Sequence, residues 1–251
     1  MTDTKHLLVD REGHIVTVKL NRPEQRNALS LPLMLELTEV LQQIGNSDAR
    51  GVILAANGPV FSAGHHFADM AGHSHDEVRE LFRICTDMMD LLQALPQPVV
   101  ARVHGLATAA GCQLVATCDL AVAAASASFA LPGGKGVCHT PLVAVARNLG
   151  RKRALELAMT GDPIDARTAA DWGLVNRVVP DDQLEAATLD LISRATRGAA
   201  ESKAVGKQAY YRQMEMPQPA AYGHAGDVMA ENALGAAAQA SFRAFLDKRK
   251  H

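Results

Sequence analysis

The sequence predicts a mixed α/β core followed by a helical C-terminal section. Short apolar runs that are typical of strands alternate with helical patterns, so that a strand, strand, helix unit recurs about three times along the chain. The last roughly 60 residues show helical patterns and no strand signal, and such a section is too thin to form a stable domain alone. We therefore expect it to pack on the core or on another subunit.

The individual elements follow from apolar spacing and from residues that begin or end helices. Apolar runs predict strands at residues 6–10, 14–20, 51–56, 99–103, 120–124, 128–130 and 176–179. The first two strands flank an Arg-Glu-Gly turn, which is typical of a hairpin. A helix capped by Asn27 or Ser30 is predicted to end at Gly45. A second helix is predicted over 76–95, after a loop at 57–72.

The segment 98–119 combines a strand, a tight turn of small residues at 105–111 and a helix over 111–117, with no polar loop between them. Small residues let a ligand approach the main chain closely. The first N–H groups of a helix have no intrahelical acceptor and lie at the positive end of its dipole. The order of elements therefore predicts a site for a negatively charged oxygen, with Gln113 projecting from the first helical turn.

Composition excludes several functional classes. The net charge of −2 and the lack of a basic stripe argue against nucleic-acid binding. No stretch reaches the roughly 18 apolar residues of a membrane span, and the first residues show neither a signal core nor a leader pattern. The cysteines lack CxxC spacing and predict buried free thiols in a reducing compartment; they are Cys85, Cys112, Cys118 and Cys138. We expect a cytoplasmic protein that binds neither nucleic acid nor membrane.

Five segments resemble the crotonase superfamily, the enoyl-CoA hydratase/isomerase proteins, over essentially the whole chain. They are LNRPEQRNALS, GPVFSAGHHFADM, PVVARVHGLATAAGCQLVATCDLAVA, TGDPIDARTAADWGLVNRVVP and FRAFLDKRK. The run GLATAAGCQ most resembles the enoyl-CoA-hydratase-domain-containing subgroup. The resemblance implies a spiral of ββα repeats over 1–195 and a helical trimerisation region over 196–251, assembled as homotrimers or dimers of trimers. It also implies an acyl-CoA thioester as ligand, with no cofactor beyond the coenzyme A of the substrate.

In such proteins two backbone N–H groups form an oxyanion hole that binds the thioester oxygen. The matching positions are His65 and Ala110, and because both act through the main chain, their side chains need not disable the hole. Residues that match the regions lining the CoA and acyl path are Arg26, Ala28, His66, Phe67 and Ala68. This agrees with the oxygen site predicted from segment 98–119.

The two catalytic glutamates of family hydratases are absent here. Their matching positions hold Gln113 and Gly133, and neither residue can exchange a proton near neutral pH. Hydration needs a base for water and an acid for the α carbon, and losing such help costs about 10²–10⁴ in rate per group. We therefore expect weak or no hydration of simple enoyl-CoA substrates.

Other residues could supply the missing proton transfer. The loop 133–141 holds Lys135, Cys138 and His139, and His139 is the best titratable candidate because the pKa of an imidazole lies near neutrality. The alternatives are a locally hydrogen-bonded loop histidine and, for Cys138, a buried thiol in place of a nucleophile. Asp69 is a further candidate for catalysis or substrate binding, and its alternative role is a helix or loop cap.

Three functional hypotheses remain open. The first is an enzyme that holds an acyl-CoA enolate between the N–H groups of His65 and Ala110, and the second is a catalytically silent acyl-CoA binder. The third is a metal or scaffold role, because His65, His66, His73 and His75 lie close to Asp69 in sequence. No HxxxH or HExxH pair occurs among them, so we expect no functional metal site.

Overall fold

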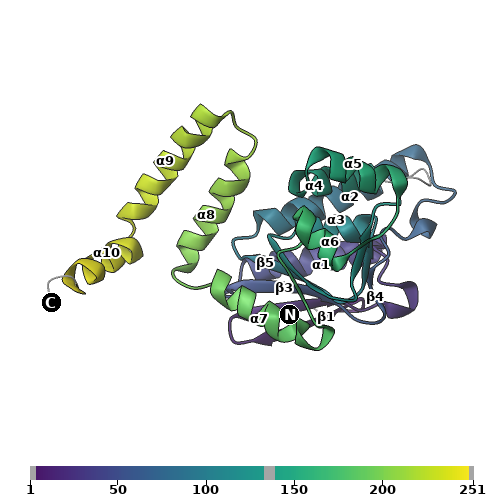
Figure 1. Cartoon of the computed structure of the whole chain (residues 1–251), viewed down its shortest axis with the longest axis horizontal. Helices are drawn as coiled ribbons and strands as arrows, with labels where there is room; N and C mark the ends of the chain where they lie inside the picture. The colour runs from purple at the N-terminus through teal and green to yellow at the C-terminus, as the bar shows by residue number, and fades with distance from the viewer. Residues whose placement is uncertain (1–3, 133–138, 249–251) are drawn as a thin grey trace.

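The computed structural model describes residues 4–132 and 139–248 and shows a mixed α/β core with a helical arm (Figure 1). The strands are β1 (Leu7–Glu12), β2 (Ile15–Leu20), β3 (Gly51–Ala56), β4 (Val60–Ser62), β5 (Val99–Val103), β6 (Leu106–Thr108), β7 (Leu120–Ala124), β8 (Ser128–Ala130), β9 (Ile164–Asp165) and β10 (Arg177–Val179). The helices are α1 (Leu31–Gly45), α2 (His75–Ala94), α3 (Ala110–Thr117), α4 (Thr140–Asn148), α5 (Arg151–Thr160), α6 (Ala166–Trp172), α7 (Leu184–Ala195), α8 (Ala200–Gln213), α9 (Gln218–Leu234) and α10 (Ala236–Lys248). The predicted α/β class is confirmed.

Successive strand, strand, helix units build a spiral. Over the described residues, the strands form a six-stranded sheet in the order β1-β2-β3-β5-β7-β10 and a four-stranded sheet in the order β4-β6-β8-β9. The β1–β2 and β8–β9 pairs are antiparallel, and the other neighbours are parallel. In the units β3-β4-α2, β5-β6-α3 and β7-β8-α4, the first strand joins the larger sheet and the second joins the smaller one. Equivalent turns of successive units therefore lie side by side.

The larger sheet is buried on both faces. Leu54 and Val99 point to the side covered by α1, α2 and α3, where they belong to the main core. The alternate residues Ile53 and Val100 belong to a second cluster that includes Ile192 of α7. Burial on both faces explains why the parallel strands are continuous apolar runs in the sequence.

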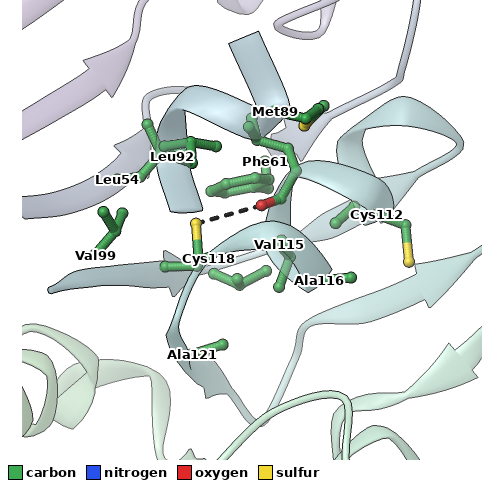
Figure 2. Close-up of a cluster of buried hydrophobic side chains, with 14 of the residues drawn as sticks. Leu54, Phe61, Met89, Leu92, Val99, Cys112, Val115, Ala116, Cys118 and Ala121 are labelled. Atoms are coloured by element: carbon green, nitrogen blue, oxygen red, sulfur yellow. Dashed lines mark hydrogen bonds between the residues drawn. The ribbon is translucent and has the colours of Figure 1, made fainter. Parts of the chain in front are cut away.

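Figure 2 shows how α2 and α3 share the main core. Phe61 of β4 lies among Met89 and Leu92 of α2 and Val115 of α3, and all four side chains are buried. Cys118 follows α3 and its thiol contacts the Leu114 carbonyl oxygen at 3.3 Å. The smaller sheet is thereby packed directly against the helices that follow the larger one.

The cysteine prediction is confirmed for the positions that the structure describes. Cys85 and Cys118 are free and buried, and Cys112 is buried as well. Burial raises the pKa of Cys85 to about 12, so its thiol stays protonated and unreactive at neutral pH. Cys138 lies outside the described residues.

Three strands differ from the sequence-based expectation. β4 lies in the predicted loop 57–72, β6 lies in the predicted turn 105–111, and β9 lies where no strand was predicted. Each is only two or three residues long. Such short elements leave no local periodicity because two or three residues are too few to show an apolar repeat.

The arm formed by α8, α9 and α10 extends away from the core (Figure 1). Neither α8 nor α9, both fully described, contains a buried residue. Large apolar side chains stand in solvent along α9, where Tyr222 is 72% exposed and Met229 is 70% exposed. No described helix is both long and apolar enough to cross a membrane.

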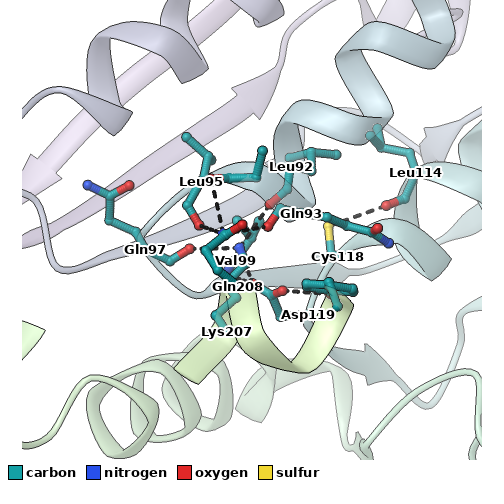
Figure 3. Close-up of polar contacts among 12 residues, drawn as sticks. Leu92, Gln93, Leu95, Gln97, Val99, Leu114, Cys118, Asp119, Lys207 and Gln208 are labelled. Atoms are coloured by element: carbon teal, nitrogen blue, oxygen red, sulfur yellow. Dashed lines mark hydrogen bonds and ion pairs between the residues drawn. The ribbon is translucent and has the colours of Figure 1, made fainter. Parts of the chain in front are cut away.

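A polar junction joins α8 to the core (Figure 3). Lys207 Nζ lies 2.8 Å from Asp119 Oδ2 and also donates to the Leu92 and Gln97 carbonyl oxygens. The Tyr211 hydroxyl donates to Asp119 Oδ1 at 2.7 Å. Burial lowers the pKa of Lys207, and the Asp119 carboxylate opposes this shift. Because Asp119 follows α3 by two residues, this junction links the arm to the helix that begins at Ala110.

The approach of α3 to β4 generates a stability prediction. A Cβ at Gly111 would lie 2.5 Å from the Ser62 carbonyl oxygen and 2.7 Å from Ser62 Cβ. We expect Gly111→Ala to lower the free energy of unfolding by about 1–3 kcal/mol, as overpacking does. Gly206→Ala is the control, because its Cβ meets nothing within 4 Å in α8 and it should stabilise by roughly 0.5–1 kcal/mol. Urea unfolding at one protein concentration measures both, and a Gly111→Ala protein as stable as the parent would contradict this packing.

Candidate active site

Two turns meet through a close backbone contact. Gly64 has φ +87°, and a Cβ there would lie 2.7 Å from Ala109 Cβ and 3.1 Å from the Ala110 nitrogen. Glycine is required because the conformation is left-handed and no side-chain atom fits in the gap. The turn after β4 and the first turn of α3 are thereby held in contact.

The His65 N–H group is left unpaired by the bridge beside it. Leu29 donates its N–H to the Gly64 carbonyl oxygen at 2.8 Å, and its own carbonyl oxygen accepts from His66 N–H at 3.4 Å. This parallel bridge uses the groups on either side of His65 N–H. Among the described residues, that N–H has no hydrogen-bond acceptor.

The Ala110 N–H group is the first of α3 and also has no acceptor in the described part of the chain. The preceding residue, Ala109, has φ 52° and ψ −124°, a strained conformation for a residue with a side chain. Its N–H donates to the Ala130 carbonyl oxygen at 2.9 Å, and its carbonyl oxygen accepts from Gln113 N–H at 3.0 Å. These two hydrogen bonds hold Ala109 in place and fix the position of the Ala110 donor.

Both donors belong to residues that line one cavity of about 550 Å³. The described residues lining it are Ala63, His65, Phe67, Met70, Phe82, Ala109, Ala110, Pro132, His139, Thr140 and Pro141. Most of these side chains are apolar, so water competes little for the two donors. Phe67 is 77% exposed and therefore lies at the mouth of the cavity. The structure thus brings together His65, Ala110, Phe67 and His139 from the predicted set.

His65 and His139 differ in their surroundings. The His65 ring packs edge-on against Phe82, with ring centroids 5.2 Å apart. Burial lowers the pKa of His65, and the Leu29 carbonyl and the Asp69 carboxylate oppose that shift in part. The imidazole is therefore neutral at pH 7. His139 is exposed and directly precedes α4.

Asp69 acts as a helix cap. Ser30 occupies the N-cap position of α1 but makes no side-chain capping bond. Asp69 Oδ2 instead accepts from Leu31 N–H at 2.8 Å, where a carboxylate also interacts favourably with the helix dipole. His66 Nδ1 lies 3.8 Å from the other carboxylate oxygen. This arrangement corresponds to the capping alternative for Asp69.

The remaining predicted residues are not among the described residues lining the cavity. Arg26 and Ala68 are exposed, and Ala28 is buried. Gln113 is buried in the first turn of α3, and its Oε1 has no hydrogen-bond partner. Gly133, together with Lys135, lies outside the described residues.

Sequence reasoning missed the supporting role of Asn27. Its side chain is fully buried, accepts from Arg22 N–H at 2.8 Å and donates to the carbonyl oxygens of Asn57 and Val60. Ser62 Oγ donates to the Asn27 carbonyl oxygen at 2.8 Å. These bonds tie the turn before α1 to β4. Asn27 has φ 49°, so the available signal was an asparagine in a turn that needs a left-handed residue.

The histidine-rich turn does not gather into a metal site in the described chain. No group of three or more His, Cys, Asp or Glu side chains there is placed to hold a metal ion. His73 Nδ1 lies 3.6 Å from Glu77, and His75 Nδ1 lies 3.4 Å from Asp76. These two imidazoles thus face carboxylates at the start of α2.

Comparisons with known proteins agree with this architecture. The family model described as enoyl-CoA hydratase/isomerase matches residues 10–251. Enoyl-CoA hydratase domain-containing protein 3 from Danio rerio is 41% identical over 247 residues, which are 97% of this chain and 86% of the relative. The corresponding Homo sapiens protein is 39% identical over 240 residues, covering 94% and 79% of the two chains.

Solved structures show the same fold. The crystal structure of an enoyl-CoA hydratase from Mycobacterium smegmatis superposes with a TM-score of 0.95 at 44% identity, covering 98% of this chain and 97% of that one. The crystal structure of human enoyl-CoA hydratase domain-containing protein 3 superposes with a TM-score of 0.94 at 37% identity, covering 97% and 98%.

The predicted cytoplasmic location is contradicted by these relatives. The vertebrate proteins from fish, frog, rodents and human are all named as mitochondrial. Buried thiols indicate reducing surroundings, and they do not distinguish one reducing compartment from another. The cytoplasmic assignment is therefore corrected.

The resemblance found in the sequence is confirmed by the relatives and by the solved structures. The relatives include the enoyl-CoA-hydratase-domain-containing subgroup, and they align over nearly the whole of this chain. The solved structures share its ββα spiral and its helical arm from end to end. The chain therefore belongs to the enoyl-CoA hydratase/isomerase family.

Proposed function

We propose that this protein binds an acyl-CoA thioester and polarises its carbonyl between the N–H groups of His65 and Ala110. The observation that carries this proposal is the pair of unpaired donors on residues that line one apolar cavity. Each preorganised donor of this kind contributes on the order of 10²–10³ in rate when charge develops on the oxygen. One relative with 29% identity is named 2,3-dehydroadipyl-CoA hydratase, which supports a CoA thioester as the ligand class. No cofactor beyond the coenzyme A of the substrate is included in the proposal.

The proposed activity on simple enoyl-CoA substrates is weak. Gln113 replaces one glutamate and Gly133 replaces the other, so neither position exchanges a proton. Among the described residues that line the cavity, the titratable side chains are His65 and His139. His139 is the candidate for proton transfer, because it borders the cavity and is exposed to solvent protons.

A catalytically silent acyl-CoA binder is the second candidate function. The lining residues that the structure describes include no carboxylate, which is the observation that favours it. Such a protein would keep the two N–H donors and the apolar cavity, and it would lack a general acid and a general base.

We also propose that the arm over residues 196–251 assembles the chain into a homotrimer or a dimer of trimers. Tyr222 and Met229 are seven residues apart and therefore share one face of α9. Both side chains are exposed in the single chain, as is Leu234 at 77%. An apolar face of this kind indicates contact with another protein surface.

The contact at Gly64 allows a test of the donor pair. Gly64→Ala places a Cβ against Ala109 and Ala110, so the two N–H groups move apart and butyryl-CoA should bind about tenfold more weakly. Gly72→Ala is the matched control, because Gly72 has φ +79° and its Cβ would meet nothing within 4 Å. Isothermal titration calorimetry measures both dissociation constants, with circular dichroism to verify folding. Equal affinities for the two variants would contradict the proposed donor pair.

Restoring the carboxylates tests the cause of the weak hydration. The double variant Gln113→Glu with Gly133→Glu should hydrate crotonyl-CoA at least about 10²-fold faster than the parent, because it regains a general base and a general acid. Gly133→Gln is the control, since it adds a side chain of the same size without an acidic proton. The rate is measured from the decrease in absorbance of the enoyl group as crotonyl-CoA is hydrated. Parent activity comparable to that of a proficient hydratase would overturn the proposed weakness.

Charged side chains introduced on α9 test whether the chain assembles through the arm. Tyr222→Glu combined with Met229→Glu places two charges on the exposed apolar face and should reduce the assembly to single chains. Lys203→Glu changes the net charge by the same amount at an exposed position of α8 and should leave the assembly intact. Analytical ultracentrifugation measures the mass, expected at three or six chains for the parent. A parent that sediments as one chain would overturn the proposal.

A further inference from the structure

The first helix of the arm, α8, caps the last turn of α2 (Figure 3). The last carbonyl oxygens of a helix have no N–H partner within that helix, so they need donors from elsewhere. Lys207 Nζ donates to the Leu92 carbonyl oxygen at 2.9 Å, and its charge suits the negative end of the α2 dipole. Gln208 Nε2 donates to the carbonyl oxygens of Gln93 and Ala94, both at 3.1 Å. The end of α2 is therefore completed by side chains that lie about 115 residues further along the chain.

The same helix binds the carboxylate that follows α3. Asp119 Oδ2 lies 2.8 Å from Lys207 Nζ and accepts from Val99 N–H, at the start of β5, at 2.7 Å. The Tyr211 hydroxyl donates to the other carboxylate oxygen at 2.7 Å. The Lys207 side chain is 8% exposed and the Asp119 side chain is 14% exposed, so the ion pair is largely removed from water. A displacement of α8 would leave a buried charge without its partner, and the junction therefore favours one docked position.

Polar contacts, and not apolar packing, hold α8 in this position. The described residues of α8 include none that is buried, and neither hydrophobic cluster of the described core includes a residue of this helix. Residues 196–199 join α8 to α7, and within them Gly198 has φ +90° with open space around its Cβ position. Loss of the polar contacts would therefore release α8 as a unit while the core stays packed.

The two helices that α8 contacts also form walls of the proposed acyl cavity. Phe82 of α2 lines the cavity and packs edge-on against the His65 ring. α3 begins at Ala110, which presents one of the two N–H donors, and its eight residues are all buried. Because a helix of this length is only about 12 Å long, a displacement of its last turn moves its first turn as well. The position of α8 is thus transmitted to both walls.

We propose that α8 is a coupling element between the arm and the acyl cavity. Its docking holds α2 and α3 in the arrangement that binds acyl-CoA, and acyl-CoA binding in turn favours the docked state. The effect is reciprocal because a ligand that prefers one of two states shifts the equilibrium towards that state. This inference rests on the proposed function and adds a regulatory link to it. A closed assembly requires every arm to leave its core in one direction, so assembly through the arm also strengthens acyl-CoA binding.

Calorimetric titration with butyryl-CoA tests the effect of the arm on the cavity. Lys207→Met removes the buried charge, and Gln208→Met removes the donors to α2 while it leaves the ion pair intact. Neither residue is among the described residues lining the cavity, and each variant should bind butyryl-CoA about fivefold or more weakly than the parent. Lys203→Met is the matched control, because Lys203 is exposed one turn earlier on α8 and its loss should leave the affinity unchanged. Gln208→Met decides the test if Lys207→Met does not fold.

Hydrogen–deuterium exchange of the parent, with and without saturating butyryl-CoA, tests the effect of the cavity on the arm. Binding should slow exchange about fivefold or more in α8 and in the last turn of α2. Exchange in β1 and β2 is the internal reference, because these strands report a general gain in stability and lie outside the junction. In Gln208→Met, the slowing in α8 should be lost.

The outcomes separate the coupling from the proposed function. Parent affinity in Gln208→Met would overturn the coupling, and so would slowing that is confined to the cavity or is equal in β1, β2 and α8. Each of these results would leave the proposed function standing. Failure of the parent to bind butyryl-CoA would overturn the proposed function itself.

Discussion

The site depends on a backbone contact that two glycines permit. Gly111 brings the first turn of α3 onto Ser62, and Gly64 brings the turn after β4 onto Ala110. Neither contact has room for a side chain, so the main chains of two successive repeats meet directly. Because main-chain atoms have little freedom once both turns are packed, the N–H groups of His65 and Ala110 are fixed before any ligand arrives. Preorganisation of this kind avoids an ordering cost during binding and reaction.

Polar side chains from distant parts of the chain hold these turns in place. Asn27 joins the turn before α1 to β4, and Asp69 caps α1 from the turn that follows His65. Both side chains make hydrogen bonds to the main chain, as expected for buried or half-buried groups. The contrast with the site is informative, because the N–H groups of His65 and Ala110 lack acceptors in the described chain.

Local sequence patterns predicted the strands of the larger sheet well and those of the smaller sheet poorly. The runs at 51–56 and 99–103 became β3 and β5 at the predicted bounds, because strands buried on both faces are continuous apolar segments. β4 and β6 were assigned to a loop and a turn, since each has only three residues and shows no apolar repeat of its own. The cytoplasmic location failed for a different reason: composition does not encode an address within the cell.

The sequence by itself determined the α/β class, the helical arm and the family resemblance. These features reside in residue identity and short-range spacing, which need no coordinates. Tertiary structure alone decided that His65 and Ala110 present unpaired donors on one cavity, that Asp69 caps α1, and that the His65 ring packs against Phe82. The physical reason is that hydrogen-bond satisfaction depends on every neighbour in space. Those neighbours, such as Leu29 and Phe82, come from separate repeats that the fold brings together.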